Sequence, residues 1–278
     1  MNRFVKLTNF ELSRFMKLYL VLVALTIIVQ MAGVIVTANS YMAEANKMIF
    51  EEGLLSQAQF IEQYGPMSFL NVVHSLWFMG PIAFCAAALL FYIFMIWYRD
   101  WFGKNTFIYR LLMLPTARLN VYLAKAVSIV LMVLGLVSVQ LIILPLENSV
   151  LKWLVPIDFR ADMTVGQIVN LDNYLSILIP QTFTEFILYY GAGFMAVSVL
   201  FTALLIERSF GWKGIVLGIG YTALSVIIMI SPLLAIAFMD HYYLYPLETL
   251  GMEIGLGLLV TVGSLWMGHY LLTRKITV

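Results

Sequence analysis

The sequence predicts an all-α polytopic membrane protein with six transmembrane helices, organised as one domain over residues 1–278. Of the 278 residues, 62% are hydrophobic and 11% are charged, and the mean hydropathy is +0.94, which lies outside the range of soluble globular domains. Several apolar stretches reach the length of about 20 residues that a helix needs to cross a bilayer core. Strands of a membrane barrel would alternate apolar and polar residues, and runs such as LYLVLVALTIIVQMAGVIV do not.

Six apolar stretches define the predicted spans, in chain order. They are Leu18–Ala38, Leu70–Trp97, Ala126–Leu146, Phe183–Ile206, Gly214–Phe238 and Thr249–Leu272. No internal repeat and no Gly/Ser-rich or Pro-rich linker divides the chain, which favours a single membrane domain.

Residues 1–17 precede the first span and contain a possible helix start. Thr8 and Glu11 have the spacing of a capping box, in which each side chain satisfies a free backbone N–H group of the other. A helix that begins there forms an interfacial elbow before the first span; an ordinary extension of that span is the alternative. The following apolar stretch exceeds the core of a signal peptide, which favours an uncleaved anchor.

The distribution of Lys and Arg sets the predicted orientation, because cytoplasmic loops carry an excess of both. With both termini inside, 13 of the 16 Lys and Arg residues are cytoplasmic and Lys47, Lys152 and Arg160 are left outside. Most acids lie outside; the exceptions are Glu11, Asp100 and Glu207. The sequence therefore predicts a multi-pass protein of the cell membrane, with cytoplasmic termini and extracellular loops at residues 39–69 and 147–178.

Motifs of common catalytic sites are missing from the sequence. It has no phosphate-binding loop of the G-x-x-x-x-G-K-[ST] type, no H-E-x-x-H zinc motif and no G-x-S-x-G elbow. The three histidines lie on different spans or loops, so we expect no catalytic residue, no metal site and no cofactor on this chain. We also expect no acidic or basic residue in the middle of any span, which disfavours an ion-coupled carrier.

Residues 98–125 form a basic segment between the second and third predicted spans. Asn105 or Thr106 can cap a short helix over residues 107–113. Leu114 precedes Pro115, which biases Leu114 away from helical geometry and ends that helix. Thr116 can cap a second helix that leads into the third span. The segment is therefore predicted to be an ordered helix–turn–helix on the cytoplasmic side; a plain basic loop that only enforces topology is the alternative.

The run YRLLMLPTAR at residues 109–118, followed by YLAK at residues 122–125, resembles the membrane subunits of type-two ATP-binding-cassette exporters. The N-terminal elbow, the six spans and the basic tail at residues 273–275 agree with that resemblance over the whole chain. In that family the corresponding segment is a coupling helix that seats in a separate ATPase subunit. The resemblance implies that the coupling residues are Phe107, Tyr109, Arg110, Leu111, Leu114, Pro115, Thr116 and Arg118, with Arg110 and Arg118 pairing acidic groups of the ATPase.

The same resemblance implies that ATP and Mg are bound by two copies of a partner ATPase, and that this chain pairs with a second copy or a sister permease. The connection at residues 239–248 is shorter than in many members, which favours the small-permease branch.

The substrate expectation rests on the Met-rich and aromatic spans. An apolar cavity suits an amphipathic peptide, a toxin or a drug-like molecule, and candidate lining residues are Trp77, Phe78, Glu185, Tyr189 and Tyr190. Packing and lipid contact are the alternative roles for each of them. Two other functions stay open: a membrane immunity or sensor protein that binds a peptide without transport, and an ion-coupled secondary carrier. No feature of the sequence indicates a nucleic-acid partner.

Overall fold

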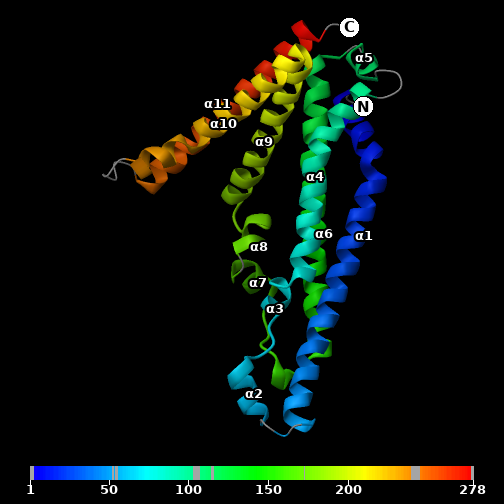
Figure 1. Ribbon diagram of the computed structural model, residues 1–278, viewed down its shortest axis with the longest axis vertical. Coiled ribbons are helices and arrows are strands. Elements are labelled where there is room, and N and C mark those ends of the chain that lie inside the picture. The colour runs from blue at the N-terminus through cyan, green and yellow to red at the C-terminus, as the bar shows by residue number, and fades with distance from the viewer. Residues whose placement is uncertain are drawn as a thin grey trace. The chain divides into compact units, whose positions relative to one another are not determined.

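Four of the six predicted apolar stretches lie within one long helix of the computed structural model of the chain (Figure 1). The other two each run past one end of their long helix: Leu70–Trp97 at its beginning and Thr249–Leu272 at its end. The structure describes residues 3–51, 53, 56–102, 107–113, 116–171, 173–238 and 245–276. Within these residues six helices are long and apolar enough to cross a membrane, and there is no β-strand. The prediction of an all-α polytopic membrane protein with six spans is confirmed at this level.

The six long helices differ from the predicted spans mainly at their ends: each extends beyond its span at one or both ends, α4 begins later than predicted, and α11 ends slightly earlier. They are α1 (Arg3–Asn46), α4 (Leu76–Phe102), α6 (Arg118–Leu154), α9 (Phe183–Phe210), α10 (Trp212–Phe238) and α11 (Pro246–Tyr270). At 1.5 Å per residue α6 is about 55 Å long, well beyond the about 30 Å of a hydrocarbon core.

Short helices occupy the connections. They are the π-helix η1 (Lys47–Glu51), α2 (Gln57–Tyr64), α3 (Phe69–Val73), α5 (Phe107–Leu112), the 3-10 helix η2 (Ile157–Phe159), α7 (Val165–Leu171), α8 (Asn173–Leu178) and the π-helix η3 (Leu271–Lys275). Ser56 begins α2 with a complete capping box to Gln59, and Thr182 begins α9 with one to Glu185.

The chain forms two compact units. Unit 1 comprises residues 1–14, 89–131 and 182–278; unit 2 comprises residues 15–88 and 132–181. The long helices α1, α4 and α6 contribute one part to each unit, whereas α9, α10 and α11 belong to unit 1 alone.

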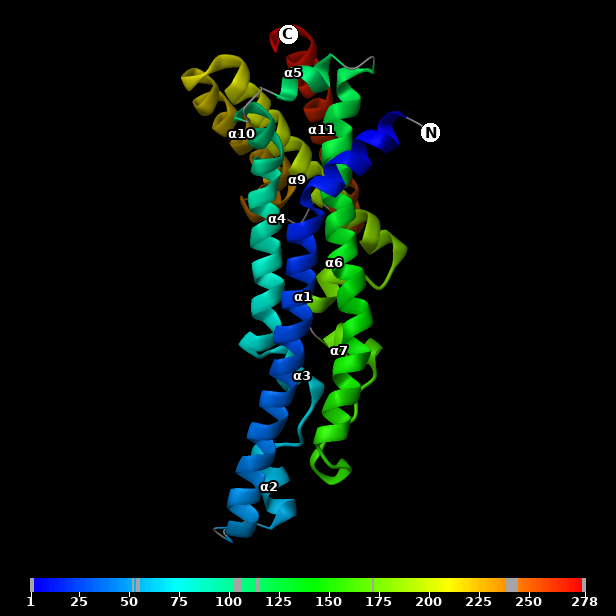
Figure 2. The same cartoon turned by 90° about the vertical axis from the view of Figure 1, so that its right-hand side faces the viewer.

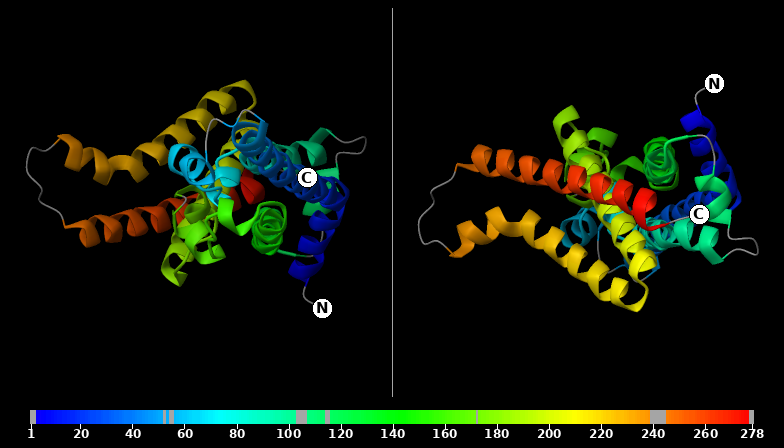
Figure 3. Two further views of the ribbon diagram at one scale, coloured as in Figure 1. Left: turned by 90° about the horizontal axis from the view of Figure 1, so that it is seen from below. Right: turned by 90° about the horizontal axis from the view of Figure 1, so that it is seen from above.

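In unit 1, α10 and α11 run side by side and both pack on α9 (Figure 3). Buried polar groups tie the helices together. The Tyr122 hydroxyl donates to the Ser198 carbonyl at 2.7 Å, and the Thr202 hydroxyl donates to the Ser264 carbonyl at 2.9 Å. The Tyr122 ring also packs edge-on against Phe201 at 5.5 Å. These contacts join α6, α9 and α11 in a region where an unpaired polar group would be costly.

The close approach of α11 to Tyr122 requires a glycine at position 268. A Cβ atom there would lie 2.9 Å from a ring carbon of Tyr122, and that ring is buried and held by its hydroxyl. We expect Gly268→Ala to lower the free energy of unfolding by about 1–3 kcal/mol, the usual cost of overpacking. Gly263→Ala is the matched control on the same helix, because a Cβ atom at position 263 meets nothing within 4 Å. Detergent-unfolding curves of the two variants check this, and equal stability would contradict it.

In unit 2, α1, α4 and α6 run next to one another (Figure 2). The Gln30 amide donates to the Phe78 carbonyl at 3.2 Å, and the Tyr19 hydroxyl donates to the Met132 carbonyl at 3.3 Å. The two predicted extracellular loops meet here, since the backbone N–H of Met67 donates to Phe159 and the Met67 carbonyl accepts from Ala161, both at 2.9 Å. The loops at residues 39–69 and 147–178 are therefore partly helical and paired with each other.

Several local expectations are wrong. The second span does not begin at Leu70, because residues 69–73 form the separate helix α3 and α4 begins at Leu76. The loop predicted from residue 39 begins too early, because α1 continues to Asn46.

The capping box of Thr8 and Glu11 does not form, because α1 begins at Arg3 and the Thr8 hydroxyl donates to the Phe4 carbonyl within the helix at 3.2 Å. The predicted loop at residues 147–178 begins too early, because α6 continues through Pro145 to Leu154. A proline inside a membrane helix is tolerated where neighbouring groups satisfy the freed carbonyl.

Candidate functional site

The candidate site lies in unit 1 around α5, the short helix between α4 and α6. Ile108, Leu111 and Leu112 are buried, and Leu111 belongs to an apolar cluster with Leu7, Val121 and Ala124. Phe4 and Phe107 pack against the same cluster. One face of α5 is therefore anchored to the beginnings of α1 and α6.

The other face of α5 is exposed. Tyr109 and Arg110 of α5 and Met113, which directly follows it, all present their side chains to the surface, with Met113 68% exposed. We call these three residues the exposed face of α5. An aromatic ring, a guanidinium group and a thioether are the side-chain types that protein–protein interfaces favour.

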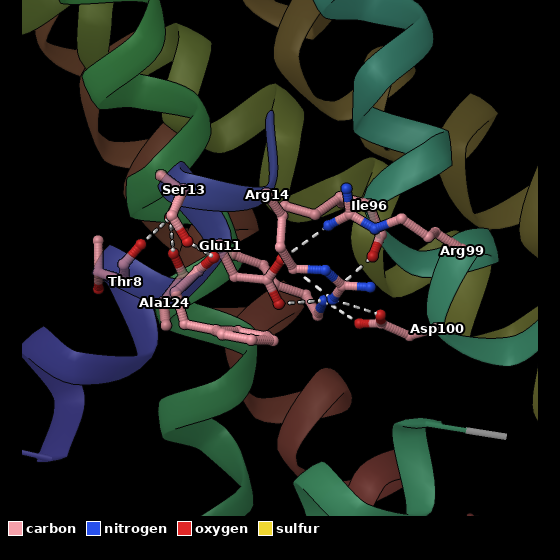
Figure 4. A network of polar contacts seen from close by, with 11 residues as sticks. Thr8, Glu11, Ser13, Arg14, Ile96, Arg99, Asp100 and Ala124 are labelled. Carbon is pink, nitrogen blue, oxygen red and sulfur yellow. Dashed lines mark hydrogen bonds and ion pairs between the residues drawn. The ribbon is translucent and has the colours of Figure 1, made fainter. Parts of the chain in front are cut away.

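A buried network of charges lies next to this helix (Figure 4). Its centre is Lys125 of α6, whose ammonium group donates to Glu11 of α1 at 2.7 Å, to Asp100 of α4 at 2.5 Å and to the Ile96 carbonyl at 3.0 Å. The Arg14 guanidinium donates to the second oxygen of Asp100 at 2.7 Å, and Arg99 donates to the second oxygen of Glu11 at 3.1 Å.

All the central groups of this network are satisfied. Lys125 has three N–H donors and three acceptors, and each carboxylate has a cation at both oxygens. Glu11, Asp100 and Lys125 are at most 2% exposed. Because the desolvation cost of buried charges is offset only by such complete pairing, removal of one partner is expected to be expensive. The network thus joins α1, α4 and α6 at one level of unit 1.

Arg14 connects the charge network to α5. Its guanidinium group lies over the ring of Phe107 at 5.2 Å and over Phe10 at 5.1 Å, while it donates to Asp100. The two phenylalanine rings stack with centroids 5.7 Å apart. A displacement of α5 would therefore act on Phe107, then on Arg14, and through Asp100 on α4 and α6.

The predicted coupling residues have different environments. Leu114 and Pro115 lie outside the described residues. The Thr116 hydroxyl is buried and has no hydrogen-bond partner in the part of the chain that the structure describes, so the expected helix cap at Thr116 is wrong. Arg118 donates to the carbonyls of Leu272 and Ile276, at 2.5 and 3.0 Å. The Arg118 guanidinium group thus binds carbonyls of this same chain, whereas Arg110 is exposed.

The five residues proposed from sequence for a substrate cavity fall into both units. In unit 2, Phe78 is buried against Phe69, and Trp77 lines an open apolar groove of about 460 Å³ with Leu25 and Phe84. In unit 1, the Glu185 carboxylate accepts from the Thr182 backbone at 3.3 Å as part of the α9 cap.

The two tyrosines of this set follow Glu185 on α9. Tyr189 is 42% exposed, and the Tyr190 ring packs against Phe186 at 4.7 Å. Of the five residues, Trp77 alone lines the groove described in unit 2, and Glu185 has a local structural role in the cap of α9.

Sequence reasoning missed the network of Glu11, Asp100 and Lys125. One signal in the sequence could have found it, because Glu11 and Asp100 are acids on the predicted cytoplasmic side, where most charged residues are Lys or Arg. They are two of the three acids assigned to that side. The third, Glu207, also has a partner, because its carboxylate accepts from the Tyr98 hydroxyl at 2.6 Å. An acid retained among many basic residues indicates an internal partner.

The fold and this site define a helical multi-pass membrane protein with a short helix, α5, between two of its spans. No family model, no curated protein and no solved structure matches the chain.

Proposed function

We propose that the chain is the membrane subunit of an ATP-driven exporter and that α5 is its contact with a separate ATPase. The proposal starts from the resemblance of residues 109–125 to type-two ATP-binding-cassette exporters. The observation that carries it is the arrangement of α5: one face is anchored in unit 1, and the other exposes Tyr109, Arg110 and Met113.

The charge network supports a coupling role for α5. Packed and fully hydrogen-bonded groups transmit a displacement, because they resist deformation more than loosely packed groups do. Phe107 and Arg14 connect α5 to Asp100, and Lys125 connects Asp100 to Glu11. A force that the ATPase applies to α5 would thus reach three helices at once.

The rest of the proposal concerns orientation and assembly. Unit 1 contains residues from both ends of the chain, and an even number of crossings would return the chain to the side on which it starts. We place both termini and α5 in the cytoplasm of a cell whose membrane the six helices cross, in accordance with the excess of Lys and Arg there. Two permease chains would pair with two ATPase subunits, which bind ATP and Mg. The substrate would be an amphipathic or hydrophobic peptide, toxin or drug-like molecule.

A second candidate function is an ion-coupled carrier. The observation that favours it is Glu147, a fully buried acid inside α6, which lies directly after the predicted third span and not in its middle. Such a carrier would need no ATPase, so α5 would have no partner to bind.

Purification from the native host in mild detergent tests the proposed function. We expect an ATPase subunit with a phosphate-binding loop to co-purify in a one-to-one ratio with this chain, and the complex to hydrolyse ATP in a vanadate-sensitive manner. Mass spectrometry identifies the subunit, and a phosphate-release assay measures turnover. A purified, folded chain that transports substrate with no such subunit would contradict the proposal and favour the carrier.

A further inference from the structure

Glu147 is a buried acid without a hydrogen-bond partner in the part of the chain that the structure describes. It lies in the part of α6 that belongs to unit 2, its side chain is 0% exposed, and both carboxyl oxygens lack a hydrogen-bond partner among the described residues. The three other buried charged residues of the described chain, Glu11, Asp100 and Lys125, satisfy one another. Glu147 therefore differs from the residues of the charge network in having no described partner for its carboxyl group.

The basic groups near the end of α6 are already engaged. Arg160 donates to Asp162 at 2.9 Å and to the carbonyls of Lys152 and Val155, and the Lys152 ammonium lies 3.6 Å from Asp162. The hydrogen bond from Arg160 lowers the pKa of Asp162. Asp162 is thus the ionised partner of both Arg160 and Lys152.

Every other acid, base or histidine of unit 2 whose side chain is described is exposed or half-buried and makes no described bond to Glu147. These residues are Lys17, Glu44, Lys47, Glu51, Glu62, His74, Lys152, Asp158, Arg160 and Asp162. No described acid, base or histidine of unit 2 is therefore bonded to Glu147, and no described residue donates a hydrogen bond to either of its carboxyl oxygens.

Two neutral polar side chains share this part of unit 2. Gln140 lies two turns before Glu147 on the same face of α6, about 10 Å away along the axis. Its amide nitrogen is buried without a described partner, and so is the amide oxygen of Gln30 on α1. The helices α1 and α6 both run from unit 1 into unit 2, and the Tyr19–Met132 hydrogen bond sets their register. In this register Gln30 lies between the levels of Gln140 and Glu147 along the axis of α6. In Gln30 and Gln140, polar atoms without a described partner are therefore available to a proton or a water molecule. Neither side chain carries a charge that could balance a carboxylate at Glu147.

We propose that Glu147 is a proton-binding site. An isolated carboxylate in such surroundings is far less stable than the neutral acid, so the carboxyl group holds a proton while the interior of unit 2 is closed. It releases the proton when a rearrangement opens that interior to water. The site goes beyond the proposed export function and does not depend on an ATPase, so each can fail without the other.

A hydrophobic carbodiimide detects the proton directly. The protonated acid adds across the N=C=N group to give an acylisourea, which rearranges to a stable N-acylurea; the acid proton moves to nitrogen and no group leaves. We expect dicyclohexylcarbodiimide to modify Glu147 at neutral pH and to leave the exposed Glu44 unmodified, as read by peptide mass spectrometry. A water-soluble carbodiimide with an added amine should show the opposite selectivity. Modification of Glu147 only by the water-soluble reagent would overturn the proposal.

Proton release on unfolding gives a second readout that does not depend on reagent access. When the chain unfolds at neutral pH, Glu147 enters water and ionises, so the wild type should release about one more proton per chain than Glu147→Gln. Gln has the same shape without the acid. Equal proton release from the two proteins would overturn the proposal. Protection of Glu147 from carbodiimide by added Na⁺ or K⁺, together with equal proton release, would identify a metal cation as the ligand instead.

Discussion

Lys125→Met is expected to lower the free energy of unfolding by about 3 kcal/mol or more, because removal of one partner from a buried ion pair leaves a buried charge that is only partly compensated. Asp100 would keep one cation, Arg14, and Glu11 would keep Arg99. The methionine fills most of the space of the lysine stem, so the loss reports the charge rather than a cavity. Detergent-unfolding or thermal-unfolding curves measure it.

Two further variants separate this effect from a general loss of charge. Lys213→Met removes an exposed cation at the beginning of α10 and should change stability by no more than about 0.5 kcal/mol. Lys125→Met combined with Asp100→Asn should recover part of the loss, because the asparagine leaves no buried charge at position 100. A Lys125→Met protein as stable as Lys213→Met would show that the network does not hold the helices together.

Arg110→Glu is expected to weaken binding of the ATPase by about tenfold or more while the chain itself stays folded. A change of about 1.4 kcal/mol in binding free energy is already tenfold in affinity, and reversal of a charge that faces an acidic partner costs at least that. Arg110 is exposed on α5 and has no role in the charge network, so unfolding temperature should not change. Titration of the purified permease with the ATPase measures the affinity.

The matched control for this prediction is Lys213→Glu, which makes the same change in charge at another exposed position of unit 1. It should bind the ATPase with nearly the affinity of the wild type. Equal losses in the two variants would indicate that only the overall charge of this side of the protein matters, and would remove the argument for α5.

The spans could be predicted from sequence because each is an apolar run of the length that a bilayer requires. The ends could not, because a helix continues past its apolar part wherever neighbouring residues also favour helix. Pro145 and Glu147 end the apolar run of the third span, yet α6 passes through both of them. Glu147 was therefore placed in a loop by hydropathy, although its side chain is buried in the fold.

The candidate site could be predicted only in part. The short helix of the basic segment followed from local signals near Phe107, and the structure has it as α5. The charge network joins Glu11, Asp100 and Lys125, which lie far apart in sequence, and no local pattern places them together. The contact of Arg118 depends in the same way on distant residues, the carbonyls of Leu272 in η3 and of Ile276 directly after it. The resemblance implied instead that Arg118 pairs with an acidic group of the ATPase.

The central claim is that the exposed face of α5 touches an ATPase, and site-directed crosslinking measures that contact most directly. Cys85 is the only cysteine and it is buried, so a Cys85→Ala background allows one new thiol at a time. Met113→Cys places that thiol on the exposed face of α5, and Trp153→Cys places it on an exposed position of unit 2 that is 84% exposed. With a bifunctional reagent in native membranes, Met113→Cys should give a product that contains this chain and the ATPase, and Trp153→Cys should not. Absence of that product at Met113, when the ATPase is present and the thiol reacts with a small probe, would contradict the claim.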